Sequence, residues 1–308
     1  MQDNKRYVII DCDPGTDDVT SMLYLFARPE IEVVGITPVG GNKELSMCKE
    51  ISLAVVEQYA PYDIPVAKGE AVALNGIKNI TVPGYCLGGA KLPAPQKEVE
   101  DIAACDFIYQ KALQYSGKLE LLVIGPHMNV GLAFKKYPDL KDHIKAIYMM
   151  GGTADKGNIT PYAEYNFGAD PEASQYIVNS GVPLVVMPLG VCGRAYITDA
   201  EIDDIGTLGR TGTFLHEMLA GPIYRSVQNG RPGCGQCDPT AAVYMIRPEI
   251  FTCEEVNLTV VQQGEQKGKT VFDKNGVVNA RIGVDVDREA FVSELRESAI
   301  ALNAILNR

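Results

Sequence analysis

The chain alternates between short apolar runs and longer segments whose apolar residues recur every three or four positions. Short runs that end at Gly or Pro are typical of buried strands, and longer periodic segments are typical of amphipathic helices. The runs that we predict as strands in the first two thirds of the chain are residues 7–10, 31–39, 64–67, 119–124, 144–150 and 183–187. Because helical segments separate them, we predict an α/β fold with an open, mostly parallel, Rossmann-like sheet flanked by helices.

The segments between these runs supply the expected helices. They begin near residues 17, 43, 99, 130 and 171. In the second of them, Leu45, Cys48, Ile51 and Val55 are spaced by three or four residues, which places them on one face of a helix. We therefore expect these helices to pack an apolar face onto the sheet.

The last third of the chain has a different pattern. Beyond residue 199 it is more helical, and strand-like segments lie near residues 257–261, 270 and 277. A final helix carries Phe291, Leu295, Leu302 and Ile305 on one face. No repeat or linker divides the sequence, so we predict one domain over residues 1–308, with extra C-terminal helices and a small β element.

Residues 69–98 interrupt the alternation with many Gly and Pro residues and little periodicity. A loop of this length inside a compact domain is usually functional or mobile. A plain surface insertion is the alternative.

Charge and cysteine content narrow the class of protein. The net charge of −11 argues against binding to a nucleic acid, because a phosphate backbone requires a basic surface. There is no apolar run of membrane-spanning length and no signal-peptide pattern, so we expect no membrane association. The eight Cys are then expected to be reduced thiols in a cytoplasmic protein.

The most acidic strand end is the stretch D-C-D-P-G-T-D-D at residues 11–18. Open α/β sheets bind ligands at the carboxyl ends of their strands. Acids this close resist ionisation unless a cation compensates them, and carboxylate oxygens suit Ca²⁺ or Mg²⁺. The stretch therefore predicts a divalent-metal site. The alternative is an acidic turn in which Asp17 caps a helix and Asp18 is favoured by the helix dipole.

Other strand ends carry polar or Gly-rich residues that would gather at the same edge of the sheet. They are G-G-N at residues 40–42, G-P-H-M-N at 125–129 and M-M-G-G at 149–152, with G-N-I-T-P at 157–161 and A-E-Y-N at 163–166 beyond them. The stretch C-G-Q-C-D-P at 234–239 adds another acid. This convergence predicts one polar site.

These stretches resemble the signatures of the inosine–uridine-preferring nucleoside hydrolases, from about residue 7 to residue 238. That family consists of metal-dependent enzymes that cleave the N-glycosidic bond of a nucleoside to a free base and ribose. The resemblance implies that Asp13, Asp18, Asp238 and the backbone carbonyl of Met128 hold Ca²⁺. It also implies that Asp13 takes a proton from a metal-bound water, which attacks the anomeric carbon.

Two residues of the 125–129 stretch depart from the family's Gly-Pro-Leu-Thr-Asn. Met128 replaces the Thr, and a backbone ligand tolerates that change. His127 replaces the Leu, and we expect a surface or capping side chain there.

The resemblance also implies how ribose is held. The residues expected to contact it are Asp17, Asn42, Met150, Asn158, Glu164 and Asn166. Amide and carboxylate groups pair well with vicinal hydroxyls, and Met150 would lie under the sugar ring. For Asn42, ordinary loop or N-cap chemistry is the alternative. Asp170 and Pro171 are interpreted structurally, as the start of a helix.

Cys237 stands where the family usually has a His that protonates or polarises the leaving base. A subgroup of the family carries Cys there, and a thiol is largely protonated at pH 7 but is a weak donor. The Cys234-x-x-Cys237 spacing also allows a zinc site or a redox pair, for which a lone C-x-x-C is a weak signal.

Base recognition has several candidates. Tyr85 lies in the long loop, where a family His aligns roughly with Pro83 or Tyr85, and Tyr224, Arg225 and Asn229 precede Asp238. Tyr224 has a core position as its alternative, since it continues an apolar helical spacing.

The sequence thus predicts a Ca²⁺-dependent ribonucleoside hydrolase with a small-molecule nucleoside substrate, working as a homodimer or homotetramer. The alternatives are a hydrolase for a modified nucleoside such as a 7-deazapurine, and a non-catalytic binder of nucleosides or ribose.

Overall fold

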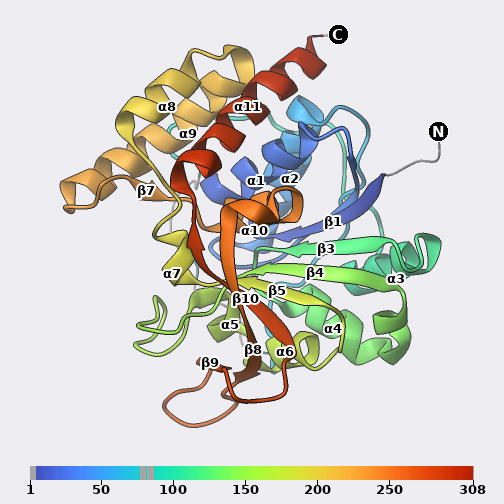
Figure 1. The fold of residues 1–308 in the computed structure, drawn as a ribbon. Coiled ribbons are helices and arrows are strands. Elements are labelled where there is room, and N and C mark those ends of the chain that lie inside the picture. Colours follow the sequence, from blue (N-terminus) through green and yellow to red (C-terminus); the bar gives the residue numbers. More distant parts are fainter. Residues whose placement is uncertain (1–4, 77–80, 82–86, 308) are drawn as a thin grey trace.

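An eight-stranded sheet forms the centre of the computed structural model, which describes residues 5–76, 81 and 87–307 (Figure 1). The strand order is β2-β1-β3-β4-β5-β10-β8-β9. These strands are β1 (Arg6–Cys12), β2 (Ile31–Pro38), β3 (Leu119–Val123), β4 (Ile144–Met150), β5 (Leu184–Met187), β8 (Phe251–Val260), β9 (Thr270–Asp273) and β10 (Ala280–Val286). Pairing is parallel from β2 through β10, while β8 and β9 add antiparallel strands at one edge. The predicted open, mostly parallel sheet is confirmed.

Helices connect the strands and cover both faces of the sheet. The helices are α1 (Thr16–Phe26), α2 (Leu45–Tyr59), α3 (Ala104–Gln114), α4 (Met128–Lys136), α5 (Tyr165–Ala169), α6 (Pro171–Val178), α7 (Leu189–Cys192), α8 (Asp199–Gly206), α9 (Gly209–Gln228), α10 (Cys237–Ile246) and α11 (Arg288–Leu306). Two 3₁₀ turns, η1 (Pro138–Asp142) and η2 (Pro248–Ile250), and a two-stranded sheet of β6 (Tyr196–Ile197) and β7 (Cys234–Gly235) complete the fold. The extra C-terminal helices were expected. The strand-like segments predicted near residues 257–261 and 270 are β8 and β9, which lie at the antiparallel edge of the central sheet.

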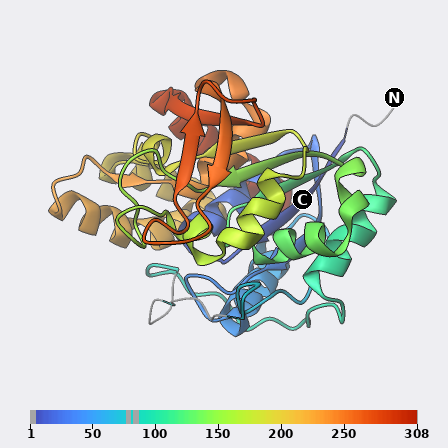
Figure 2. The same cartoon turned by 90° about the horizontal axis from the view of Figure 1, so that it is seen from below.

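The central strands are buried on both faces, which explains their continuous apolar runs. In β1, Val8 and Ile10 belong to one core and Ile9 belongs to the other. The first core lies under α1, α2, α9, α10 and α11, and the second lies under α3, α4 and α6. Figure 2 shows the green α4 and yellow-green α6 together on this second face.

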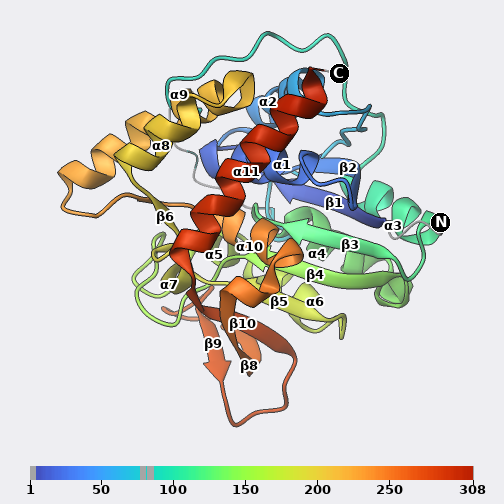
Figure 3. The ribbon, with the colours of Figure 1, turned by 45° about the horizontal axis from the view of Figure 1, so that its top comes forward.

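The C-terminal helix α11 crosses over α1 and α9 (Figure 3). Its Glu294 is nearly buried and accepts hydrogen bonds from Arg28, Tyr24 and Arg247. A buried carboxylate is tolerated only when it is paired in this way. In the described part of the chain, no helix has both the length and the apolar character needed to cross a membrane.

Three predicted elements differ from the structure. Residues 64–67 form only an isolated bridge between Ile36 and Val66, because Pro65 has no N–H to extend a ladder. The helix predicted from residue 99 begins at 104, since the amide of Glu100 and the carbonyl of Ile102 pair with the 66–68 segment instead. The strand expected near residue 277 starts at 280, beyond a turn.

Candidate active site

The predicted site residues meet in one pocket at the carboxyl ends of the central strands. Its volume is about 110 Å³. The residues that line it are Asp13, Asp17, Asn42, Ile124, Met150, Asn158, Glu164, Tyr165, Asn166, Leu189, Cys237 and Asp238. Of the residues predicted for the site, Asp18 and Met128 are fully buried and do not line the pocket. Segments that are far apart in the sequence therefore form a single polar site.

Three carboxylates come close together at this pocket, where Asp17 and Asp238 line it and Asp18 is buried beside them. Oxygen atoms of Asp17, Asp18 and Asp238 lie within 4.8 Å of one another. Asp17 and Asp18 come from the first turn of α1, and Asp238 comes from the first turn of α10. Both helices thus direct an N-terminus at the acids, which favours negative charge there. The sequence had predicted Asp13 rather than Asp17 in the metal group.

Asp13 lies against the loop that follows β2. Its Oδ2 atom accepts a hydrogen bond from the Asn42 amide at 2.6 Å. A Cβ atom added to Gly41 would lie 2.1 Å from the same oxygen, so this close approach requires glycine. The G-G-N stretch therefore brings the Asn42 backbone to Asp13 as well as placing the Asn42 side chain in the pocket.

Asp18 also has a structural role, in addition to belonging to the cluster with Asp17 and Asp238. Its Oδ2 atom accepts from the Gly15 amide at 2.9 Å, and its Oδ1 atom accepts from the Asp13 amide at 3.1 Å. It thereby caps the start of α1. The acidic-turn alternative is correct to this extent, although the capping acid is Asp18 and not Asp17.

The electrostatics of the cluster fit a hard divalent cation. Burial, and then the charge of Asp17, raises the pKa of Asp18 to about 7. Burial and neighbouring carboxylates likewise raise the pKa of Asp13 and the pKa of Asp238 well above the usual range. Burial and mutual repulsion make these carboxylates harder to ionise, and a bound cation would offset that effect. Their oxygen atoms are ligands that suit Ca²⁺ or Mg²⁺. The residues present thus fit the metal that the sequence predicts.

Glu164 and Asn166 also line the pocket. Glu164 caps α5, accepting from the amides of Asn166 at 2.9 Å, Gly152 at 2.8 Å and Phe167 at 3.2 Å. Burial still raises the pKa of Glu164 to about 7. The Asn166 side chain donates to the carbonyls of Ile124 and Met150, so it joins the ends of β3 and β4. These bonds fix both polar side chains before any substrate binds.

Asn158 approaches from the loop after β4. Its Oδ1 atom accepts from the Tyr165 amide at 2.7 Å, and the residue is exposed. The loop is thereby tied to α5 and carries Asn158 to the rim of the pocket.

Cys237 is the first residue of α10 and faces a second thiol. Hydrogen bonding to the Cys192 thiol, and then burial, raises the pKa of the Cys237 thiol. Cys192 also lies 3.8 Å from the Cys237 carbonyl and 3.8 Å from the Thr240 hydroxyl. All cysteines among the described residues are free thiols, and no metal-ligand group found there contains Cys234 or Cys237.

The expectation of a surface His127 is wrong, although the residue does occupy the N-cap position of α4. The side chain is fully buried, edge-on to Phe167, and makes no capping bond. The Ser174 hydroxyl donates to the Asp170 carbonyl at 2.8 Å, so its oxygen accepts from His127 Nδ1 at 2.7 Å. Burial lowers the pKa of His127 to about 3, which keeps it neutral directly before Met128.

Three lining residues received no role from the sequence. Tyr165 stands between Glu164 and Asn166, and this aromatic residue inside a polar motif was the available signal. Ile124 and Leu189 gave no signal, since apolar residues are common at the ends of strands and helices.

The base-contact candidates are mostly outside this pocket. Tyr85 and Pro83 lie outside the described residues. Tyr224 is 62% exposed on α9, so its core alternative is wrong. Arg225 and Asn229 lie at the end of α9 and do not line the pocket.

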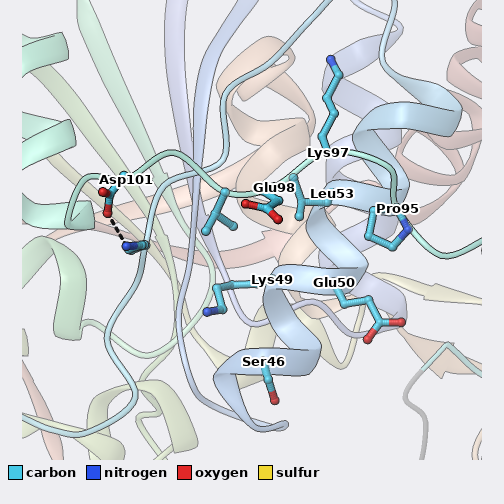
Figure 4. A pocket seen from close by; sticks show the side chains of 10 residues that line it. Ser46, Lys49, Glu50, Leu53, Pro95, Lys97, Glu98 and Asp101 are labelled. Carbon is cyan, nitrogen blue, oxygen red and sulfur yellow. Dashed lines mark hydrogen bonds and ion pairs between the residues drawn. The ribbon is translucent and has the colours of Figure 1, made fainter.

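A wider hollow of about 540 Å³ lies between α2 and residues 95–101 (Figure 4). Lys49, Lys97, Glu50 and Glu98 line it, and Lys68 pairs there with Asp101. None of the strand-end acids reaches this hollow. Its mixed, solvated charges are those of an ordinary protein surface, so we assign the site to the smaller pocket.

Comparison with known proteins agrees with this geometry. The family model described as inosine-uridine preferring nucleoside hydrolase matches residues 8–293. The pyrimidine-specific ribonucleoside hydrolase RihA of Salmonella schwarzengrund is 32% identical over 303 residues, which cover 94% of this chain and 97% of that protein.

Two solved structures superpose closely. One is a purine-preferring ribonucleoside hydrolase from Gardnerella vaginalis, with 28% identity, a TM-score of 0.91 and coverage of 97% of this chain and 100% of that one. The other is the plant nucleoside hydrolase PpNRh1, with 26% identity, a TM-score of 0.90 and coverage of 96% and 99%. The chain therefore belongs to the inosine–uridine preferring nucleoside hydrolases, enzymes that act on N-glycosidic bonds.

Proposed function

We propose that this protein is a Ca²⁺-dependent ribonucleoside N-ribohydrolase that releases a free base and ribose. The observation that carries the proposal is the meeting of buried acids, ribose-binding amides and the Cys237 thiol in one pocket. A neutral nucleoside suits it better than a phosphorylated one, since the carboxylates of Asp13, Asp17 and Asp238 line the pocket.

Asp13, Asp18, Asp238 and the backbone carbonyl of Met128 would hold the cation. When bound, a divalent cation lowers the pKa of water and helps to orient the substrate. The close group of Asp17, Asp18 and Asp238 supports a cation at this position. In the proposal Asp17 turns to the ribose hydroxyls instead of the metal.

Asp13 acts as the general base. Its Oδ2 atom is held by the Asn42 amide, which fixes the plane of the carboxylate for accepting a proton from the attacking water. Water then adds to the anomeric carbon as the bond to the base breaks, with oxocarbenium character at the sugar.

The ribose is held by Asp17, Asn42, Asn158, Glu164 and Asn166, above Met150. Glu164 and Asn166 are pre-oriented by backbone bonds, so little rotamer freedom is lost when the sugar binds. A site of this kind rejects sugars that lack the paired hydroxyls.

Cys237 faces the leaving base in this proposal. The Cys192 thiol and the Thr240 hydroxyl donate to the Cys237 carbonyl and so fix this residue at the start of α10. Cys237 lines the pocket there, and its thiol can donate to the departing base. A thiol donates weakly, so bases that leave readily are the better substrates.

Related proteins differ in the base named for them, pyrimidine in one case and purine in another. A modified nucleoside such as a 7-deazapurine therefore remains the second candidate substrate. A non-catalytic nucleoside or ribose binder is the third, and the retained Asp13 argues against it.

We also propose a cytoplasmic homodimer or homotetramer. The free thiols among the described cysteines support a reducing compartment. Light scattering coupled to gel filtration tests the assembly, and a monomer at micromolar concentration contradicts it.

The experiment that tests the function is ribose release from a panel of purine, pyrimidine and 7-deazapurine nucleosides, with and without a chelator. We expect release from at least one nucleoside, its loss on chelation and its return with added Ca²⁺. Release that resists chelation contradicts the metal role, and Ca²⁺ binding without any release favours the binder.

A further inference from the structure

The first acid of the 11–18 stretch, Asp11, has no role in the proposed function. It lies near the end of β1 and is 1% exposed. Its Oδ2 atom accepts the Thr37 hydroxyl at 2.6 Å and the Asn129 side-chain amide at 2.8 Å. Its Oδ1 atom has no hydrogen-bond partner among the described residues. A buried carboxylate that uses one oxygen for two donors requires an explanation.

The two donors come from different strand-end segments. Thr37 precedes Pro38 at the end of β2, on the way to Asn42. Asn129 is the second residue of α4 and directly follows Met128, whose carbonyl belongs to the proposed metal group. The Asp11 carboxylate thus connects the acid-bearing end of β1 with both of these segments.

Asn129 extends the connection to a fourth segment. Its Oδ1 atom accepts from the Glu70 amide at 2.8 Å, and the Glu70 carbonyl accepts from the Gly40 amide at 2.8 Å. A Cβ atom on Gly69 would lie 1.5 Å from the Pro38 carbonyl oxygen, so these backbones touch. The network of Asp11, Thr37 and Asn129 is therefore close-packed and leaves little room for the segments to shift.

We propose that Asp11 is a positioning residue that sets the cation affinity of the site by accepting hydrogen bonds from Thr37 and Asn129. These bonds hold the first turn of α4, with Met128, and the segment leading to Asn42 in register with Asp13, which directly follows β1. The inference rests on the metal group of the proposed function.

The hydrogen bonds, and not the negative charge, perform this role. Both donors bind the same oxygen, Oδ2, so the single oxygen of an amide can accept both of them. Residues that orient metal ligands from behind typically change metal affinity by about 10- to 100-fold when they are removed. Asp11→Ala should therefore weaken Ca²⁺ binding by at least about tenfold, and Asp11→Asn should change it by less than about threefold.

The test is calorimetric titration of Ca²⁺ into the full-length protein after removal of bound metal by a chelator. Thr37→Val removes one donor with little change of volume and should weaken binding by about fivefold, while Thr37→Ser should restore it. If Asp11→Ala does not fold, the comparison of Thr37→Val with Thr37→Ser tests the proposal instead. Ser52→Ala is the matched control, because Ser52 is a buried hydroxyl on α2 without a hydrogen-bond partner among the described residues. It should bind Ca²⁺ as the unaltered protein does.

Three results overturn the inference. They are an Asp11→Ala variant within about threefold of the unaltered protein, an Asp11→Asn variant as weak as Asp11→Ala, and an unaltered protein that binds no Ca²⁺. Ribose release is measured separately on the same samples. If the protein binds Ca²⁺ normally but releases no ribose, the proposed hydrolase function is wrong, while the positioning role of Asp11 still stands.

Discussion

Several residues of the pocket serve the fold and the site at once. Asp18 caps α1 while it belongs to the acid cluster, and Glu164 caps α5 while it lines the pocket. A capping bond holds a carboxylate in one rotamer without consuming all its acceptor positions. The pocket is therefore preorganised by the same bonds that start the surrounding helices.

Replacing Asp13 by Ala should abolish turnover while ribose binding largely persists, because the general base is lost but the sugar contacts remain. We expect kcat to fall by at least about a thousandfold. Ribose release measures kcat, and calorimetry with ribose measures the binding. Near-normal turnover in this variant would exclude Asp13 as the base.

Replacing Cys237 by Ala should slow only substrates whose leaving group needs a proton. We expect kcat for nucleosides to fall by about 10- to 100-fold, and the rate for 4-nitrophenyl riboside to stay unchanged, since a phenolate leaves unaided. Cys105→Ala, a buried thiol on α3, is the matched control. If Cys237→Ala hydrolyses every nucleoside at the rate of the unaltered protein, Cys237 does not protonate the leaving base.

At the residue scale, contiguous motifs carried the predictive information. The 11–18 stretch could be placed at a strand end from the sequence pattern, and the 163–166 stretch was assigned to the site through its resemblance to the family signature; residues of both line the pocket. His127 could not be assigned, because its burial depends on Ser174 and Phe167, which lie some 40 or more positions later in the sequence. The identity of a single residue does not indicate which residues, distant in the sequence, will pack over it.

The helices and strands are joined by a few buried polar bonds that reach across loops. Asp170 caps α6 through the Ala173 amide at 3.0 Å and also accepts from the Leu74 amide at 2.6 Å. It thereby ties the segment after β2 and α2 to the second face of the sheet. The sequence had assigned Asp170 only the start of a helix, which is confirmed.

Because Asp170 has two such partners and is buried, its replacement by Ala should cost about 2–3 kcal/mol in the free energy of unfolding. Asp287, which caps α11 through the Ala290 amide alone and is exposed, is the comparison. Its replacement by Ala should cost about 1 kcal/mol. Urea unfolding measures both, and equal costs would show that the bond to Leu74 adds nothing.

Two of the three missed elements share one cause. Residues 64–67 and 99–103 have the composition of a strand and a helix start, but their backbone groups pair with each other and with β2. Local propensity could not reveal this pairing, because it depends on partners about 35 residues apart. The central strands were found because their burial on both faces makes them apolar throughout.

At the scale of the whole molecule, the protein buries carboxylates whose ionisation is unfavourable. In the metal-free protein, burial raises the pKa of Asp18 and of Glu164 to about 7, above their values in the unfolded chain. The folded state therefore binds more protons than the unfolded state between about pH 4 and pH 7. The stability from these groups is complete below that window and is lost as the pH rises through about 7.

Chelated protein should consequently melt at least about 5 °C lower at pH 8 than at pH 5.5, and added Ca²⁺ should remove most of this difference. Scanning calorimetry measures the melting temperatures. Glu164→Gln should flatten the pH dependence in part, because one of the ionising groups is gone. A melting temperature that rises with pH in the chelated protein would contradict this account.

The strand order also has a consequence for synthesis of the chain on the ribosome. β5 ends at residue 187, but its neighbour β10 is complete only at residue 286. At translation speeds of about 5–20 residues per second, the backbone edge of β5 waits roughly 5–20 s for its partner. During that time the nascent sheet ends in an unpaired apolar strand, so slowed elongation between these strands should increase aggregation of the newly made protein.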